Sequence, residues 1–152
     1  MARYGGEYTE TFVVNVPIEV AKAHFSNLDV IARNYGDVKS AKKQKNGGLK
    51  LTLNPKTEIG VTFSGEHTCK WEFATDNELV WKSIGKGNMF SRGSATFTAM
   101  GKKKTKITYR EEMELDMDVN FLLRHLIGPI VSRQIRDGVQ QYLERMRRSL
   151  EG

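Results

Sequence analysis

His67 and Cys69 are the pair of side chains whose types first suggest chemistry. They lie two residues apart in a segment, Val61 to Phe73, whose residues alternate between apolar and polar. This alternation predicts a β-strand, in which side chains two apart share a face and their α-carbons are about 6.5 Å apart. A nucleophile and its base need direct hydrogen-bond contact, so this spacing argues against a catalytic cysteine and histidine pair.

A metal site is the other chemistry that histidine and cysteine suggest. A zinc ion needs a third and usually a fourth ligand, and the remaining candidates, His24, His125 and Glu111, come from scattered segments. We therefore expect no metal and no cofactor. We expect Cys69 to be buried and to pack as a small apolar residue.

Glu111 is the most informative polar residue, because it shares a strand face with Tyr109 and Met113. A carboxylate in apolar surroundings is unfavourable unless it is paired, hydrated or protonated. A structural explanation is a water-facing or bulged position near a cavity mouth, or a salt bridge to Arg92 or Arg124.

A functional explanation is that Glu111 forms the polar end of a ligand pocket together with His67, Tyr109 and Ser91. This group could orient a hydroxyl or carbonyl group of the ligand, or act in acid–base chemistry. His125, near the start of the final helix, would cap the same cavity or point to solvent. Glu111 and His67 are the only catalytic candidates.

The final thirty residues are the clearest element of the scaffold. From Phe121 to Leu150, apolar residues recur at the spacing of one helical face, opposite a face of arginines and other polar residues. A helix of this length, roughly 45 Å, needs a large apolar surface to lie against. Gly128-Pro129 predicts a kink or a restart in its first third.

The chain begins with a predicted strand, Tyr8 to Val16, followed by two short helices. Pro17 begins the first helix, and the second runs from about Asp29, as its cap, to Tyr35. Period-two alternation with turn signals then predicts six strands. They are Val38 to Lys45, Leu49 to Asn54, Val61 to Phe73, Leu79 to Ile84, Met89 to Ala99 and Thr105 to Met117.

Pairing these strands across their Gly and Asn turns tests whether their faces agree. Trp71 falls opposite Trp81, and Gly93 falls between Trp81 and Glu111, so odd-numbered residues form one continuous apolar face. We predict an α+β fold. Its curved antiparallel sheet of about seven strands wraps around the final helix.

This order of elements resembles the helix-grip fold of the START-related (SRPBCC) superfamily. That superfamily includes polyketide cyclases, the birch-pollen allergen family and proteins similar to an accessory component of carbon monoxide dehydrogenase. The resemblance spans nearly the whole chain and is carried by VVNVPIEVAKAHFSNLDVIARNY, FSGEHTCKWEF, GKGNMFSRGSATFT, TKITYREEMEL and LIGPIV. It implies one domain with an apolar cavity between sheet and final helix, which binds lipids, sterols, polyketides or other hydrophobic molecules.

The inner face carries more large aromatic side chains than one helix obviously fills, so it is either all core or partly a cavity. The resemblance favours a cavity, gated by the short helices and the turn from Gly85 to Asn88. The expected ligand-contacting residues are Phe63, His67, Trp71, Trp81, Ser91, Phe97, Tyr109, Glu111, Met113, His125 and Ile130.

Composition sets the broad class of the protein. The 152 residues fit one domain, and 39% hydrophobic with 28% charged residues is typical of a soluble globular protein. No apolar run is long enough for a membrane span, and the N-terminus has no signal core. The single cysteine makes the cytoplasm the expected location.

The net charge of +6 is spread over predicted turns and helix ends, mainly Lys42 to Lys45, Lys102 to Lys104 and the closing arginines. No aromatic residue is interleaved with these lysines as a stacking platform, which argues against nucleic-acid binding. Basic loops of this kind are compatible with peripheral contact with a membrane or an acidic protein.

Three functions remain open from the sequence. The first is binding or transport of a hydrophobic small molecule or lipid in the cavity. The second is a cyclase or dehydratase type of enzyme that uses Glu111 and His67. The third is an accessory module without a small ligand, which docks on a membrane or protein through the basic loops. The oligomeric state is not indicated.

Overall fold

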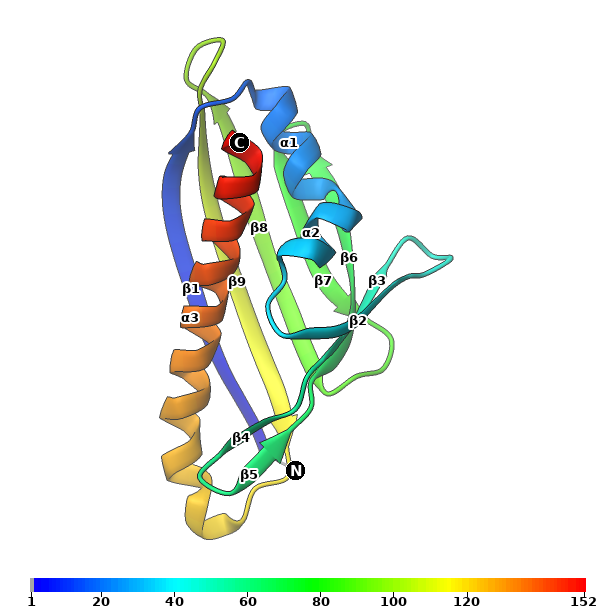
Figure 1. Cartoon of the computed structure of the whole chain (residues 1–152), viewed down its shortest axis with the longest axis vertical. Helices are drawn as coiled ribbons and strands as arrows, with labels where there is room; N and C mark the ends of the chain where they lie inside the picture. Colours follow the sequence, from blue (N-terminus) through cyan, green and yellow to red (C-terminus); the bar gives the residue numbers. More distant parts are fainter. Residues whose placement is uncertain (1) are drawn as a thin grey trace.

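A curved antiparallel sheet of seven strands wraps around one long helix in the computed structural model, which describes residues 2–152 (Figure 1). The strands are β1 (Ala2–Val14), β2 (Val38–Lys43), β3 (Leu49–Leu53), β4 (Lys56–Glu58), β5 (Val61–Phe63), β6 (Glu66–Thr75), β7 (Glu78–Ile84), β8 (Met89–Ala99) and β9 (Thr105–Met117). The helices are α1 (Ile18–Ser26), α2 (Leu28–Asn34) and α3 (Arg124–Glu151), preceded by a single 3-10 turn, η1 (Phe121–Leu123).

The sheet has the strand order β1-β9-β8-β7-β6-β3-β2. The predicted registers are confirmed: Trp71 pairs with Trp81, and Gly93 lies between Trp81 and Glu111. The odd-numbered residues of β6 to β9 form the inner face, and Phe97 is only 2% exposed. The sequence therefore predicted the α+β helix-grip fold correctly. Phe73 is an exception on this face, since it is 42% exposed near the end of β6.

β1 is longer than predicted, because it begins at Ala2 rather than at Tyr8. It pairs with β9 along its whole length, from Ala2 opposite Met117 to Val14 opposite Thr105. Two consecutive glycines, Gly5 and Gly6, interrupt the side-chain alternation at this end, so the sequence pattern did not predict the first part of the strand. The helix α3 comes close here, since Ser132 Oγ donates a 2.6 Å hydrogen bond to the carbonyl of Gly5.

The predicted strand from Val61 to Phe73 is wrong as a single element, because it breaks between β5 and β6. A side chain at Gly65 would collide with the sulfur of Met89. Asn88 fixes the break, because its Oδ1 accepts from the backbone N of Glu66 at 2.8 Å and its Nδ2 donates to the carbonyl of Ser64 at 3.0 Å. β5 leaves the sheet and pairs with β4 in a separate two-stranded hairpin.

The short helices follow the prediction with one correction. The cap of α2 is Asn27, whose Oδ1 accepts from the backbone N of Asp29 at 2.9 Å and of Val30 at 3.2 Å. Asp29, the predicted cap, lies in the first turn instead, where its charge suits the positive end of the helix dipole.

α3 continues without interruption through Pro129, so the predicted restart at Gly128-Pro129 is wrong. Pro129 lies near the start of the helix. It has no backbone N–H, so one helical hydrogen bond is missing, and its ring is exposed to solvent. A bend at this point stays a prediction. Among residues 2–152, no helix combines the length and the apolar character that crossing a membrane requires.

Candidate ligand-binding site

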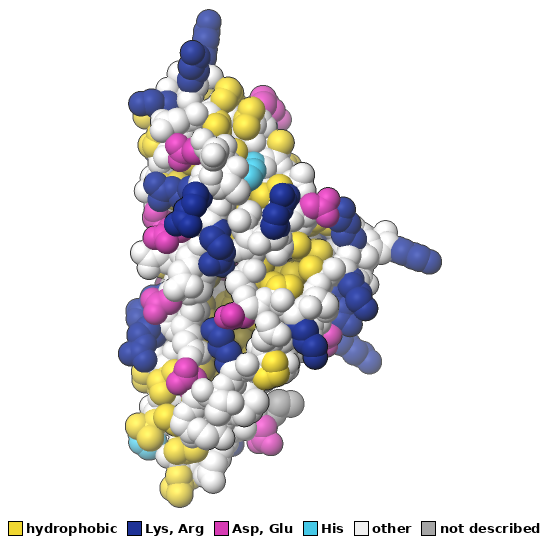
Figure 2. Space-filling view, in the orientation of Figure 1, with side chains coloured by type: hydrophobic (Ala, Val, Ile, Leu, Met, Phe, Trp, Pro, Cys, Tyr) yellow, Lys and Arg dark blue, Asp and Glu magenta, His cyan; other side chains and the backbone are white. Residues whose placement is uncertain are grey.

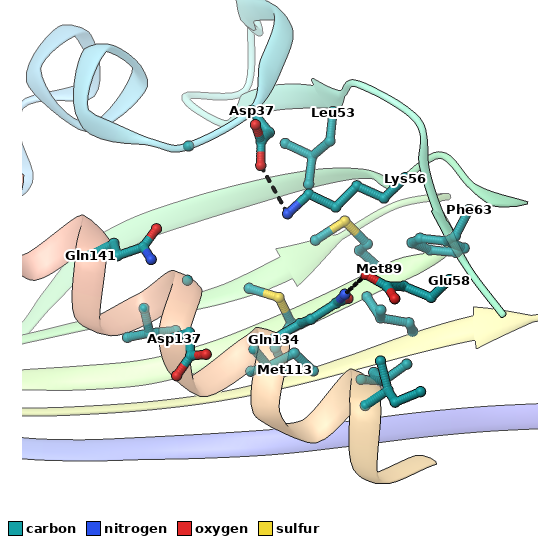
Figure 3. A pocket seen from close by; sticks show the side chains of 18 of the residues that line it. Asp37, Leu53, Lys56, Glu58, Phe63, Met89, Met113, Gln134, Asp137 and Gln141 are labelled. Atoms are coloured by element: carbon teal, nitrogen blue, oxygen red, sulfur yellow. Dashed lines mark hydrogen bonds and ion pairs between the residues drawn. The ribbon is translucent and has the colours of Figure 1, made fainter. Parts of the chain in front are cut away.

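A cavity of about 370 Å³ lies between α3 and the inner face of the sheet, a size within the range of small-molecule sites. Along α3 its lining extends from Ile127 to Arg145, and the β4–β5 hairpin covers one side (Figure 3). Most of its wall is apolar. The apolar lining comprises Leu53, Val61, Phe63, Met89, Met113, Leu115, Met117, Ile127, Ile130, Val131, Ile135 and Val139.

Polar contacts on the hairpin border the mouth of the cavity. Lys56 Nζ lies 2.9 Å from Asp37 Oδ2, and Gln134 Nε2 donates a 2.7 Å hydrogen bond to Glu58 Oε1 (Figure 3). The hairpin is thus joined to the loop after α2 on one side and to α3 on the other. Between the helix and the hairpin, the space-filling view shows a hollow with hydrophobic atoms at its floor (Figure 2).

Glu111 is the buried carboxyl group of the wall. It is only 5% exposed, and its carboxylate accepts a 2.6 Å hydrogen bond from Tyr109 Oη and a 3.3 Å hydrogen bond from Ser91 Oγ. Burial raises the pKa of the Glu111 carboxyl to about 7, and these two hydrogen bonds act in the opposite direction. At neutral pH the side chain is therefore divided between its acid and its carboxylate forms.

Two tyrosines from the helical layer reach the same end of the cavity. Tyr35 follows α2, Tyr142 belongs to α3, and their ring centroids are 5.7 Å apart. Burial, assisted by the nearby charge of Glu111, raises the pKa of both hydroxyls well above the ordinary value. Both are therefore neutral at physiological pH, and they offer hydroxyl groups and ring faces to a ligand.

His67 lies behind Tyr35 and does not line the cavity. Its Nε2 is 3.4 Å from Tyr35 Oη and its Nδ1 is 3.4 Å from Ser83 Oγ. Burial lowers the pKa of His67 to about 4, so the ring is neutral at physiological pH. The predicted pairing of Glu111 with His67 is indirect, because the backbone N of Ser91 donates to the same Ser83 Oγ at 2.8 Å.

Cys69 has the environment of a packed residue. It is 1% exposed, and burial raises the pKa of its thiol to about 12, so the thiolate is not formed near neutral pH. Its Sγ lies 4.0 Å from Ser83 Oγ, a weak polar contact. No three His, Cys, Asp or Glu side chains within residues 2–152 are placed to hold a metal ion.

The predicted site residues separate into three groups. Four of them line the cavity, namely Phe63, Glu111, Met113 and Ile130. Three others, His67, Ser91 and Tyr109, stand behind the polar end, where they contact Tyr35 or Glu111. The remaining four, Trp71, Trp81, Phe97 and His125, do not border the cavity.

Packing explains this last group. Trp81 stacks on Tyr109 with 5.0 Å between ring centroids, and Phe97 packs against Phe25 of α1 at 6.0 Å. Trp71 is partly buried on the inner face beyond the cavity, and His125 is exposed near the start of α3. Of the two positions expected for His125, capping the cavity or facing solvent, the structure has the second.

The salt bridge, one alternative offered for Glu111, is absent among the described residues, and the expected gate at Gly85 to Asn88 is wrong. Glu111 forms no salt bridge with the predicted arginines, since Arg92 pairs with Glu112 and Arg124 donates to the carbonyl of Val119. The turn from Gly85 to Asn88 does not border the cavity, because Gly87 and Asn88 pack against the start of β6. The mouth lies instead between the hairpin, the loop after α2 and α3.

Sequence reasoning missed the covering hairpin and several lining residues, notably Tyr35, Tyr142 and Arg145. The hairpin could have been recognised in the sequence, because Pro55 and Gly60 are turn-forming residues at the two ends of a short polar segment. Gly60 adopts a φ of 79° in the turn. Tyr142 could also have been recognised, since it is the only tyrosine on the apolar face of the final helix.

No family model matches this sequence, and no curated protein matches it in sequence. Solved structures do match in fold. An aromatase/cyclase from a Streptomyces species superposes with a TM-score of 0.71 at 7% identity, over 97% of this chain and 94% of that chain. A START superfamily protein from Mycobacterium smegmatis gives 0.68 at 12% identity, over 95% and 97%.

Norcoclaurine synthase from Thalictrum flavum, solved in complex with a transition state analogue, gives a TM-score of 0.62 at 10% identity. The superposition covers 99% of this chain and 96% of that chain. At identities this low the similarity establishes the fold alone. The fold is START-like, as the sequence predicted, and it is shared by enzymes as well as by a protein described only by its superfamily.

Proposed function

Because this START-like fold encloses a cavity with one polar end, we propose that the protein binds an elongated, mostly apolar small molecule or lipid there. The observation that carries the proposal is the wall itself, which is apolar around Met113 and Ile127 and polar only near Glu111 and the mouth. Removing an apolar ligand from water against such a wall is favourable, and the polar end fixes its orientation.

A cavity-filling substitution tests this proposal. Val131 is 3% exposed and lines the cavity, so Val131→Trp places a large ring where the ligand would lie. With dodecanol as probe, we expect calorimetric affinity to fall by at least about tenfold, or 1.4 kcal/mol. Thr108→Trp, on the exposed outer face of β9, is the control.

Equal dodecanol binding by the wild type and the folded Val131→Trp variant would contradict the proposal, since the probe would then bind elsewhere. Circular dichroism shows whether each variant is folded. Native mass spectrometry of protein purified from its own host complements this test, because a retained ligand would be weighed directly.

An acid–base enzyme is the second candidate, favoured by one observation: a carboxyl with a pKa of about 7 lies in the cavity wall. In a dehydration, Glu111 would take the proton next to a ligand carbonyl and return it to a leaving hydroxyl, which departs as water. His67 would act only through Tyr35, because it does not reach the cavity.

Turnover of polyketide-like hydroxyketones by the wild type and Glu111→Gln decides between binding and catalysis. The enzyme hypothesis predicts a kcat loss of about a hundredfold or more with little change in KM. Unchanged turnover in the variant removes the enzyme hypothesis and leaves the binding proposal intact.

A further inference from the structure

The carboxylate of Glu111 is buried without a cation. Its two hydrogen bonds come from the neutral hydroxyls of Tyr109 and Ser91, and no lysine or arginine among residues 2–152 forms a salt bridge with it. Buried acids are normally paired, because an isolated charge in a low-dielectric interior is strongly unfavourable. A cationic ligand would therefore supply the compensating positive charge that no described residue provides.

The remaining charges of the wall do not provide it. Asp37 and Lys56 neutralise each other at the mouth at 2.9 Å. Glu58 and Asp137 also line the cavity, and no described cation forms a salt bridge with either. Arg145 is the one other cation of the lining, and its Nε donates to the backbone carbonyl of Asn34 at 2.6 Å.

Acidic groups thus outnumber basic ones along the wall. Four carboxylates, from Asp37, Glu58, Glu111 and Asp137, face two cations, from Lys56 and Arg145. The local potential therefore disfavours an anionic ligand and favours a cationic one.

Aromatic rings strengthen the same preference at the polar end. Tyr35 and Tyr142 line the cavity at the end where Glu111 lies, with their ring centroids 5.7 Å apart. The faces of tyrosine rings attract ammonium groups, most strongly where water is excluded. A carboxylate beside two such rings is a suitable receptor for an amine or a quaternary ammonium group.

We propose that the ligand is an amphiphilic cation, whose ammonium group lies against Glu111 beside Tyr35 and Tyr142 and whose apolar body extends along Met113 toward Ile127. This inference rests on the proposed binding function and adds the charge of the ligand to it. An alcohol of the same length fills the same apolar space and can donate a hydrogen bond to Glu111, but it brings no positive charge. A fatty acid adds a second negative charge.

Three probes with the same chain test the charge preference: dodecyltrimethylammonium, dodecanol and dodecanoate, each titrated calorimetrically below its micellar concentration at about pH 8. At this pH the carboxyl of Glu111 is largely ionised. We expect the ammonium probe to bind at least about tenfold more tightly than dodecanol, and dodecanoate to bind most weakly.

Glu111→Gln keeps the shape of the side chain and removes its charge. We expect the ratio of the ammonium-probe affinity to the dodecanol affinity to fall from at least about tenfold to about one. Glu112→Gln is the matched control, since it removes the neighbouring carboxylate, which points to the outer face and pairs with Arg92. This control should keep the preference.

A pH comparison on the wild type provides an independent measurement in case Glu111→Gln does not fold. The quaternary ammonium group does not titrate, so its affinity should fall as the pH drops from about 8 to about 5 and Glu111 is protonated. The buried side chains of Cys69, His67, Tyr35, Tyr109 and Tyr142, which surround Glu111, keep their charge state over this range. The pKa of Cys69 is raised to about 12, that of His67 is lowered to about 4, and those of Tyr35, Tyr109 and Tyr142 are raised by burial.

Each outcome separates this inference from the proposed function. If the wild type binds dodecanol without preferring the ammonium probe, the inference is wrong and the binding function stands. A preference for dodecanoate also overturns the inference and indicates Arg145 as the ligand's partner. If the wild type binds none of the three probes, the proposed function fails together with the inference.

Discussion

The two ends of the interior differ although the same sheet and the same helix enclose both. At the end near α1 and the C-terminus of α3, Phe25 packs against Phe12 and Phe97 with ring centroids 6.3 and 6.0 Å apart (Figure 1). At the end near the start of α3, the cover is the β4–β5 hairpin, and a cavity of about 370 Å³ remains.

The two ends differ in the side chains that their covering elements place in the interior. α1 brings a buried aromatic side chain, whereas all three residues of β4 are exposed and only Val61 and Phe63 of β5 turn partly inward. A helix with an apolar face fills the space beneath it, but a short polar hairpin does not. We therefore expect the filled end to supply stability and the hollow end to supply binding.

The largest expected effect comes from truncating one large apolar side chain at each end. Phe97→Ala should lower the free energy of unfolding by about 3–5 kcal/mol, because it opens a void in a packed region. Met113→Ala should lower it by at most about 2 kcal/mol, because Met113 already borders empty space. Urea unfolding of both variants measures the contrast, and equal losses would contradict it.

The second effect is a pH-dependent gain in stability at the hollow end. The folded-state pKa of Glu111 is raised from 4.5 to about 7, so the folded protein holds this proton more tightly than the unfolded chain. The contribution of Glu111 to stability is therefore fully present below about pH 4.5 and is lost as the pH rises through about 7. At about pH 8, Glu111→Gln should unfold with a free energy about 1–3 kcal/mol higher than the wild type.

The stability difference between Glu111→Gln and the wild type should shrink as the pH falls toward about 4.5. The variant and the wild type must be compared at each pH, because His67 gives both proteins a pH dependence of stability with the opposite sign. Burial lowers its pKa from 6.5 to about 4, so its protonation destabilises the folded protein as the pH falls over that range. Urea unfolding at several pH values measures the effect, and a difference that stays constant would show that Glu111 does not titrate as described.

The smallest expected effect is kinetic. Gln134→Ala removes the 2.7 Å hydrogen bond between α3 and Glu58 of the hairpin. We expect less than about 0.5 kcal/mol loss of stability, because the contact is exposed, and a roughly threefold faster release of dodecanol in stopped-flow measurements. Gln140→Ala, on the exposed face of the same helix, is the control, and identical release rates for the two variants would show that the contact does not restrain the hairpin.

The strand registers were predictable, because alternation and turn residues act locally. Gly93 was placed opposite Glu111 from the spacing of the turns alone, and the structure agrees. The break at Gly65 was not predictable, since Val61 and Phe63 before it and Cys69 and Trp71 after it continue the apolar alternation. The side chain of Asn88 holds the chain between β5 and β6, since it bonds the backbone of Ser64 and of Glu66 from 24 and 22 residues further along the chain.

The polar residues of the candidate site were found from strand parity, that is, from the rule that alternate residues of a strand share a face. Their roles depend on neighbours that this rule does not specify. Parity identified Glu111, Tyr109 and Ser91 as sharing a face, and they are hydrogen-bonded. It also grouped Phe97 with them, although Phe25 of α1 covers that ring. Which inner-face residues border empty space depends on how far the side chains of the covering helices extend toward the sheet.

The β4–β5 hairpin lies outside the seven-stranded ladder and is held at its sides by exposed polar contacts. Insertions or deletions at its turn, where Ile59 and Gly60 are exposed, would therefore leave every register of the main sheet unchanged. At the opposite edge, the contact between Ser132 and Gly5 keeps α3 seated on β1. Divergent descendants of this chain could thus accommodate longer or shorter ligands through changes in one surface turn.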